Sequence, residues 1–543
     1  MRASPAPVHR TLRSRPLAAA LALAGSAGTL HAQTGAPPSE NPATIGTVLR
    51  EDGTPLRVAL RAWHEEALRN ATPPPVTTTT RPVTNCNDDG PGSLRAVIAG
   101  SASGDTVDLS ALTCSEISLE TGSISVRVDT LTLDGPDSRR LAIDGNNVDR
   151  LFLHYGGGSF TLRNLNLRDG FRRATGFHVG IGGCMASAGY LTLDHSTVSG
   201  CYAGGEGAYG GAIYAYSLIL SSSTMSDNVA YGVHPDAGMA AFGGAAFVYQ
   251  IDLVDSTITG NSAKHRFHPT RTSYDIGGGI ISVHGGLVIN STVDSNYSYG
   301  RGGGLATFDN LLISNSTISG NIAQTFGAGG VFLRFPANLV MRNSTIANNY
   351  GETAGGMMLS SLSATMQSSI IAANSASTRG VADLVDPRSL ITIGGSDNLI
   401  GQISVSITLP PDTLRGDPEL LPLAFNGGPT RTHAMRIDSP VIDAGNNVAQ
   451  LPSDQRGDGY ARVVGPSADI GAFEFNGAAP AATVLPVPAL ADRAAALLLL
   501  VLGLFGVRAL RHSLIRHAAT AAIPAIKNSS SHRPDRNAVL MRD

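Results

Sequence analysis

The amino-acid sequence predicts an all-β protein, a right-handed parallel β-helix closed by a capping C-terminal β-rich region. Three observations predict this fold. The composition is rich in turn formers, with 63 Gly among 543 residues. A six-residue motif recurs through the middle of the chain, and apolar residues alternate in the segment before most of its copies. Units this short cannot bury an apolar face alone, so they are expected to stack on one another.

The composition excludes several other classes of protein. Glycines come in pairs and triplets without a three-residue period, which excludes collagen. The 42% of hydrophobic residues argue against disorder throughout. Gly, Ser, Thr and Asn at this density would break helices repeatedly, so a helical bundle is excluded. Basic residues gather at the two ends of the chain, which leaves an acidic body and argues against nucleic-acid binding.

The N-terminus carries the pattern of a Sec-type signal peptide over residues 1–32. Arg10, Arg13 and Arg15 precede an apolar stretch that ends before Ala32. Cleavage after Ala27 and an uncleaved membrane anchor are the alternatives. Export through Sec is therefore expected. Residues 33–82 form an N-terminal segment, with one expected helix over 56–70 and a Pro/Thr linker over 73–82.

The regular repeats occupy residues 183–374. The motif Ser-Thr-apolar-x-x-Asn occurs there seven times with small variations, and a Gly pair precedes each copy by 12 to 14 residues. Apolar residues alternate between the Gly pair and the motif, which predicts a strand with one buried face. A β-propeller is less favoured, because its blades need about 40 residues each. The copies begin at Ser196, Ser223, Ser256, Ser291, Ser316, Ser344 and Ser369.

The last residue of the motif is predicted to form a ladder of stacked Asn side chains along the β-helix. Stacked amides can hydrogen-bond to one another and satisfy buried backbone groups of the turns. The members of the expected ladder are Asn228, Asn261, Asn296, Asn321, Asn349 and Asn374.

The regions on either side of the repeats complete the domain plan. Residues 83–182 lack the motif but contain strand-like runs, which predicts more degenerate coils. Residues 375–476 are predicted to form a closing region over the open end, because a terminal coil is an unpaired sheet edge.

The four cysteines all follow the signal peptide, in a compartment that permits disulfides. Three pairings are possible. Cys86–Cys114 with Cys184–Cys201 is favoured because each pair closes a short local loop. Free buried thiols are the alternative.

The C-terminus is predicted to attach the protein to a membrane. A linker over 477–493 leads to a hydrophobic segment with a basic end over 494–511, and a basic tail over 512–543 that is expected to be disordered. The segment contains 14 uninterrupted apolar residues, fewer than the ~20 of a typical span. A sorting helix or anchor is favoured over a buried helix.

Three stretches together resemble a known family. They are NCNDDGPGSLRAVIAGSASGDTVDL at 85–109, the Gly-rich coils with their motifs, and DPELLPLAFNGGPTRTHAMRIDSPVIDAGNN at 417–447 with DQRG and ADIGAFEF after it. This combination resembles bacterial right-handed β-helix surface proteins of the choice-of-anchor Q type. Residues 487–511 are similar to an IPTL-type sorting segment. The resemblance implies an exported cell-envelope protein with an exchangeable anchor, and no settled chemistry.

The sequence predicts no catalytic residue and no cofactor. Asp454, Asp458 and Asp469 are weak candidates for Ca²⁺ ligands, with turn structure as the favoured interpretation. A long insertion carries a basic group that is expected to protrude with Asp275 and offers a loop for an anionic sugar or a partner, with a solvated loop as the favoured alternative. That group consists of His265, Arg266, His268 and Arg271.

These observations favour a structural or adhesive surface protein without an evident catalytic site. Its partners would be a surface polysaccharide or a ligand on a host or neighbouring cell, and a membrane through the C-terminal segment; no nucleic acid is expected. The alternative is a polysaccharide lyase or hydrolase, or a carbohydrate-binding protein, on the same scaffold. Three or more carboxylates converging with an Arg on the coils of 183–374 would favour the enzyme.

Overall fold

The computed structural model describes the central part of the chain. Most of the expected helix 56–70, the signal peptide, the membrane segment, the basic tail and two members of the basic insertion lie outside the described residues. Within the described ranges, no helix has the length and hydropathy of a membrane span. Those ranges are 64, 66–68, 78–137, 141–174, 178–233, 240–266, 275–325, 327–334, 337–361, 363–377, 380–387 and 391–477.

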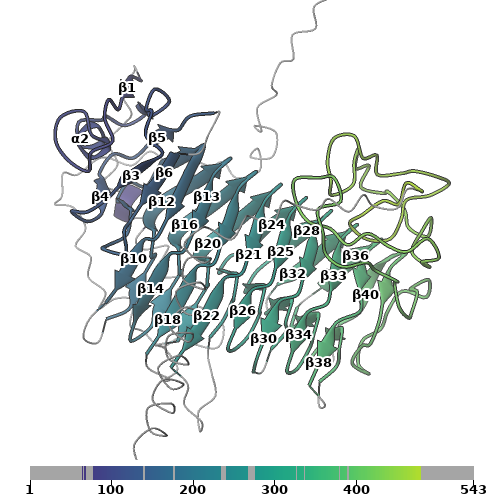
Figure 1. Ribbon diagram of the computed structural model, residues 1–543. Helices are drawn as coiled ribbons and strands as arrows, with labels where there is room; N and C mark the ends of the chain where they lie inside the picture. The colour runs from purple at the N-terminus through teal and green to yellow at the C-terminus, as the bar shows by residue number, and fades with distance from the viewer. Residues whose placement is uncertain are drawn as a thin grey trace, which may run out of the picture. The chain divides into compact units, whose positions relative to one another are not determined.

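The described chain folds as a right-handed parallel β-helix, which confirms the predicted fold class. Most coils contribute short strands to three long sheets that run along the axis (Figure 1). We call these sheets A, B and C; they contain 19, 11 and 8 of the described strands, and a small sheet D contains three. All strands of these sheets pair in parallel with the next coil.

Sheet A is the longest, because several coils cross it with two strands. In the coils of β12, β16 and β20, one long strand takes the place of these two strands, and the register of β12 on β16 shifts between Ser187 and Tyr190. Its strands are β1 (Thr80–Pro82), β2 (Thr106–Asp108), β4 (Ile124–Val126), β5 (Leu131–Asp134), β7 (Phe152–His154), β8 (Ser159–Arg163), β12 (Met185–Asp194), β16 (Ile213–Ser221), β20 (Ala246–Val254), β23 (Ile280–Ser282), β24 (Gly286–Ile289), β27 (Leu305–Thr307), β28 (Leu311–Ser314), β31 (Val331–Leu333), β32 (Asn338–Arg342), β35 (Met357–Leu359), β36 (Ser363–Gln367), β39 (Leu384–Val385) and β40 (Ile393–Ser396).

Sheet B is built from the repeated motif. The apolar residue of each copy points inward and is fully buried, as Val198 and Ile318 show, while the Thr before it points outward. Its strands are β3 (Glu116–Ser118), β6 (Leu141–Asp144), β9 (Leu165–Arg168), β13 (Thr197–Ser199), β17 (Thr224–Ser226), β21 (Thr257–Thr259), β25 (Thr292–Asp294), β29 (Thr317–Ser319), β33 (Thr345–Ala347), β37 (Ile370–Ile371) and β41 (Leu399–Ile400).

Sheet C begins two coils later than sheet B and runs to the C-terminal coils, while sheet D covers part of the corner between sheets C and A. The strands of sheet C are β10 (Phe171–Arg173), β14 (Tyr202–Gly205), β18 (Val229–Gly232), β22 (Ser262–His265), β26 (Tyr297–Ser298), β30 (Ile322–Ala323), β34 (Tyr350–Gly351) and β38 (Ser375–Ala376). Those of sheet D are β11 (Gly180–Ile181), β15 (Ala208–Tyr209) and β19 (Ala241–Phe242).

The Gly pairs lie at the corner where the chain enters sheet A. Gly210 has a φ of +68°, which side chains rarely adopt. A Cβ at Gly211 would lie 2.0 Å from the carbonyl oxygen of Gly244 in the next coil. Adjacent coils therefore approach each other here too closely for any other residue.

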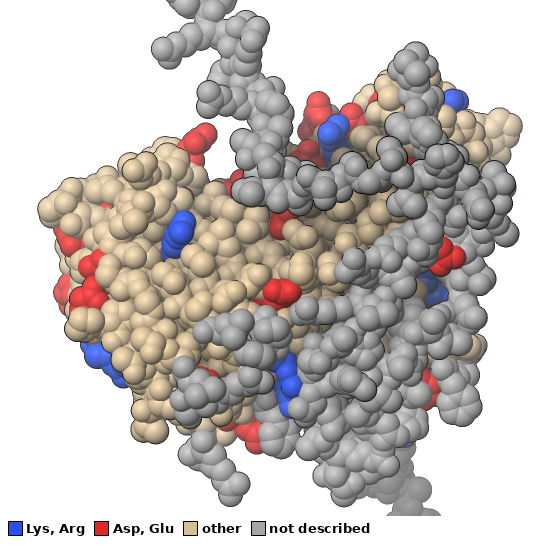
Figure 2. Space-filling view, turned by 180° about the vertical axis from the view of Figure 1, so that it is seen from behind, with Lys and Arg blue, Asp and Glu red and all other residues tan. Residues whose placement is uncertain are grey.

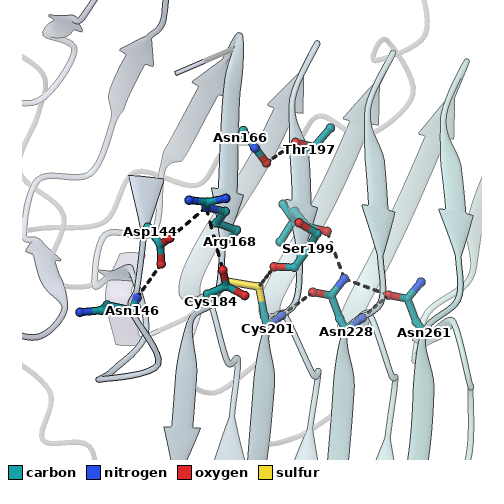
Figure 3. Close-up of a disulfide and its surroundings, with 12 residues drawn as sticks. Asp144, Asn146, Asn166, Arg168, Cys184, Thr197, Ser199, Cys201, Asn228 and Asn261 are labelled. Carbon is teal, nitrogen blue, oxygen red and sulfur yellow. Dashed lines mark hydrogen bonds and ion pairs between the residues drawn. A yellow bond between two sulfur atoms is a disulfide. The ribbon is translucent and has the colours of Figure 1, made fainter. Parts of the chain in front are cut away.

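The six predicted Asn side chains form one continuous ladder at the corner between sheets B and C. In each step the Oδ1 atom of one Asn accepts hydrogen bonds from the backbone N–H and the side-chain amide of the previous one. Cys201 occupies the Asn position at the N-terminal end and donates its backbone N–H to Asn228 (Figure 3). At the other end, Asp383 Oδ1 accepts both donors of Asn374.

A second ladder, which was not predicted, uses the first residue of the same motif. The backbone N–H of Ser196 donates to the hydroxyl of Ser223 in the next coil, and the pattern continues to Ser369, whose N–H donates to Asn398. The sheet B strands of the repeated motif are thus held at both ends, by the Ser ladder on one side and the Asn ladder on the other.

The disulfides join Cys86 to Cys114 and Cys184 to Cys201, which is the pairing that the sequence favoured. The second bridge lies at the start of the Asn ladder (Figure 3). A short helix that the sequence did not predict, α2 (Leu94–Ala99), begins at the N-cap Ser93 and packs two apolar side chains, Leu94 and Ile98, against the interior.

The predicted closing region 375–476 divides into two parts, because β38 to β41 and parallel bridges as far as Leu414 continue the stack. The closing region of the structure is therefore 417–475, and it differs from the prediction in both structure and position. Residues 417–475 contain isolated antiparallel bridges and no strand. They do not simply continue the stack over the open end but pack against the outer face of sheet B (Figure 1). The reason is visible on that face, where Ile370 takes an outward position that earlier coils give to Thr and forms an apolar cluster with Ile470 and Phe473.

Polar contacts fix the closing region on the earlier coils. Thr292, Thr317 and Thr345 are buried beneath it, and each hydrogen-bonds with one of its residues. Arg431 places Nη2 2.6 Å from both carboxylate oxygens of Asp294, which is fully buried. Burial raises the pKa of Asp294, and the Arg431 guanidinium opposes that rise.

We expect Asn321→Ala to destabilise the central coils strongly. The substitution removes the acceptor of two buried donors of Asn296 and the donor to Asn349, and each buried group left unpaired costs about 1–3 kcal/mol. Hydrogen exchange of the flanking strands measures the local effect. Asn338→Ala is the control, because Asn338 is exposed and forms its amide ladder in solvent. Equal exchange in both variants would contradict the buried ladder's role.

We expect Arg431→Met to release the closing region from sheet B. Asp294 would keep its buried charge without a cationic partner, which typically costs about 3–5 kcal/mol. Urea unfolding and limited proteolysis of residues 417–475 measure the effect. Arg436→Met is the matched control, since Arg436 is 59% exposed and its surface ion pairs are worth about 1 kcal/mol or less. Similar losses in the two variants would argue against the Arg431–Asp294 anchor.

Candidate functional site

The predicted ligand loop is partly wrong, because His265 is buried. Outward and inward side chains alternate along β22, so Lys264 is exposed and His265 points to the inner side, where it is 8% exposed. Its Nδ1 lies 2.6 Å from Oδ2 of Asp275, a fully buried carboxylate that the sequence placed in the protruding loop. Arg266 is exposed, and His268 and Arg271 lie outside the described residues.

The three candidate Ca²⁺ ligands do not come together. Asp454 is buried and binds the guanidinium of Arg456, at 2.7 Å from Nη2. Asp469 is also buried and accepts hydrogen bonds from the backbone N–H groups of Asp443 and Phe475, while Asp458 is exposed. In the part of the chain that the structure describes, no group of three or more His, Cys, Asp or Glu side chains could hold a metal ion.

A pocket of about 380 Å³ lies beside β10, the first strand of sheet C. The chain passes directly from sheet B to sheet A in the two preceding coils, through 119–123 and 145–151. Sheet C therefore has no strand in those coils, and the missing strands leave a hollow at its edge. The pocket is lined by Glu120, Thr121, Gly122, Val148, Asp149, Phe171, Arg172 and Arg173.

An aromatic ring, carboxylates and guanidinium groups meet in this pocket. Phe171 is half-buried and stacks on Tyr202 with 5.1 Å between ring centroids. Arg172 Nη1 lies 3.7 Å from Oδ1 of Asp149, and Arg173 is exposed. Glu120 supplies a second, exposed carboxylate from the first of the two preceding coils. The pocket thus combines one apolar surface with charged donors and acceptors.

Asp88 and Arg95 hold the wall that contains Glu120. Arg95 donates to the carbonyl oxygens of Gly122 and Ser123, at 2.7 and 2.9 Å, and pairs with Asp88. Asp88 in turn accepts from the backbone N–H groups of Glu120 and Thr121. Burial raises the pKa of Asp88, but the hydrogen bonds from Arg95 and Thr121 outweigh burial and place that pKa below its ordinary value.

Sequence reasoning missed this pocket. Asp88 organises a wall of the pocket together with Arg95 in the following helix. The signal that could have revealed the pocket was the shortness of the connections 119–123 and 145–151, which leave no room for a sheet C strand. The pocket contains two carboxylates and lies before residue 183, so it does not meet the criterion that would favour an enzyme.

The comparisons with known proteins assign no family. No family model matches the chain, and no curated protein matches it. Among solved structures, the crystal structure of pectate lyase Pel9A is similar at 14% sequence identity, with a TM-score of 0.39 over 74% of this chain and 97% of that chain. The class that the structure defines is the right-handed parallel β-helix; the choice-of-anchor Q type and the sorting segment stay predictions.

His154 is buried inside the β-helix and is not one of the residues that line the pocket. It is fully buried, and its Nδ1 lies 2.8 Å from the hydroxyl of Ser187. Burial lowers the pKa of His154 to about 4, against the raising effect of hydrogen bonds to the carbonyls of Val128 and Asp129. The imidazole is therefore neutral at pH 7.

We expect His154 to make the protein less stable in acid. A histidine with a depressed pKa stabilises the fold above its unfolded value of about 6.5, and the stabilisation is lost as pH falls toward 4. The slope is at most about 1.4 kcal/mol per pH unit. Urea unfolding at several pH values measures it. His154→Gln should remove this part of the slope, and the exposed control His195→Gln should keep it; equal slopes would refute the assignment.

Proposed function

We propose that this protein is an exported surface β-helix that binds carbohydrate in the pocket beside β10. The observation that carries the proposal is the meeting of the Phe171 ring with the Asp149 carboxylate and two arginines in one pocket. Carbohydrates present apolar C–H faces and rims of hydroxyl groups. A site with one aromatic surface and a few placed polar groups matches that chemistry.

The pocket is supported by rigid neighbours, as a binding site requires. The Tyr202 ring stacks on the Phe171 ring, and the ring centroid of Tyr231 in the next coil lies 6.5 Å from that of Tyr202. The wall that contains Glu120 is held by the Asp88–Arg95 pair. A site whose side chains are already ordered loses little conformational entropy when a ligand binds.

The surface location is supported by the sequence. Residues 1–32 have the pattern of a Sec signal peptide, and 494–511 have that of an anchor or sorting segment with a basic end. The four cysteines are all paired in two disulfides, which suits an oxidising compartment. The proposed role is adhesion to a surface polysaccharide or to a neighbouring cell.

A lyase or hydrolase is the second candidate, and the same pocket supports it. Glu120 and Asp149 are carboxylates beside two arginines, and carboxylates supply acid and base groups in glycoside hydrolysis. The two candidates differ in whether a bound polysaccharide is cleaved.

We expect Phe171→Ala to weaken binding of short acidic or neutral oligosaccharides at least tenfold, because the sugar loses its stacking surface. Calorimetry with a panel of oligosaccharides and the purified β-helix measures the affinity. Tyr350→Ala is the matched control, since Tyr350 is a 40% exposed aromatic of sheet C that lies six coils away, about 29 Å along the axis.

The same samples separate binding from catalysis. New reducing ends or unsaturated products that disappear in Asp149→Asn would establish the enzyme. Binding without product supports adhesion. Unchanged affinity in Phe171→Ala, or no binding by any oligosaccharide of the panel, would overturn the pocket as the site.

A further inference from the structure

The outer face of sheet C carries two columns of residues that begin at the pocket. In β10, β14, β18 and β22, which lie side by side in Figure 1, the first and third residues of each strand are on the outer side. Parallel pairing keeps both columns in register from coil to coil. The first column consists of Phe171, Tyr202, Val229 and Ser262, and the second of Arg173, Gly204, Tyr231 and Lys264.

The second column is basic at both of its ends. Arg173 and Lys264 are exposed, and neither has an ion-pair partner among the described residues. None of the outer residues of these four strands is acidic, although the body of the chain is acidic. Three coil steps separate the two cations, about 14 Å along the axis. Two unpaired cations on a strip without carboxylates favour an anionic ligand.

Aromatic rings occupy the space between the two cations. The Tyr202 ring lies over Gly204, where an added Cβ would be 2.6 Å from the phenol oxygen. The same ring stacks between those of Phe171 and Tyr231, with centroid distances of 5.1 and 6.5 Å. Burial raises the pKa of Tyr202, and the guanidinium of Arg173 opposes that rise. The absence of a side chain at Gly204 therefore brings an aromatic surface into the basic column.

The carboxylates of the pocket define the direction in which an anionic ligand would extend. Asp149 is paired with Arg172. Glu120, in the first of the two coils before β10, is exposed and has no ion-pair partner among the described residues. It would repel an anionic group, while Arg173 at the edge of sheet C would attract one. The charged part of the ligand should therefore lie over β10 to β22.

We infer that the carbohydrate bound beside β10 is an anionic polysaccharide whose carboxylate or sulfate groups contact Arg173 and Lys264. Its sugar rings lie on the aromatic surface between the two cations. This inference rests on the proposed carbohydrate binding and narrows its substrate class. A disaccharide held at Phe171 is too short to reach Lys264, three coils away, whereas a hexamer contacts both cations.

Matched ligands and matched variants test the inference. An oligouronate hexamer and its methyl ester have the same sugars and differ in charge. In calorimetry with the full-length chain, we expect the uronate to bind about tenfold more tightly, and less so as salt rises, because salt screens exposed charges. Arg173→Gln should weaken binding of the uronate dimer and hexamer about threefold, and Lys264→Gln that of the hexamer alone. Neither should change the affinity for the ester. Arg436→Gln, at an exposed arginine of the closing region, is the control and should change nothing.

The outcomes separate this inference from the proposed function. Equal affinity for uronate and ester, lost in Phe171→Ala, would overturn the anionic class and leave carbohydrate binding intact. No binding of either hexamer would overturn both. A neutral hexamer that carries sulfate groups distinguishes the two anions, and tighter binding of it than of the ester supports the inference with sulfate as the anion. Unchanged hexamer affinity in Lys264→Gln would overturn the track from β10 to β22. So would a single-stranded oligonucleotide that binds as tightly as the uronate, because charge alone would then explain the binding.

Discussion

The Asn ladder is the interaction on which the rest of the β-helix depends. At each coil the chain turns from sheet B toward sheet C, and the turn buries a backbone N–H and a side-chain amide. Each Asn satisfies both donors of the previous coil and needs the next coil to satisfy its own. The ladder therefore needs a different group at each end, a donor before the first Asn and an acceptor after the last. Cys201, tied by its disulfide, and the carboxylate of Asp383 are those ends.

The sequence predicts the stack well because each element of the stack repeats. The Gly pairs, the inward apolar residue and the Asn all recur at nearly fixed spacing. Each residue type is required at its position, by the close approach of the coils, by burial and by the hydrogen bonds of the ladder respectively. The position of the closing region is different. Thr224 and Thr317 occupy the same place in the motif, yet one faces solvent and the other is buried beneath residues 417–475. Only a residue such as Ile370 signals that the outer face is covered.

The candidate site depends on what the repeat leaves out. The pocket exists because two coils lack a strand in sheet C, and its polar groups come from three coils in register. Asp149 and Arg172 are 23 residues apart in sequence, and their proximity follows only from the stacking. The error at His265 has a related cause. Length and polarity predicted an exposed loop, but strand alternation turns His265 inward, where the buried Asp275 accepts its hydrogen bond.

The faces of the β-helix are therefore not equivalent. Part of sheet B is covered by the closing region, and sheet A bears the N-terminal contact of His64 and Tyr216. Sheet C has an outward row that begins at Phe171 in the pocket and continues, in register, with Tyr202, Val229 and Ser262. If the pocket binds carbohydrate as proposed, a linear polymer would extend from it along this row, because Tyr202 stacks on Phe171 in the next coil. The repeat that builds the scaffold would then also set the spacing at which such a polymer is contacted, about 4.8 Å per coil.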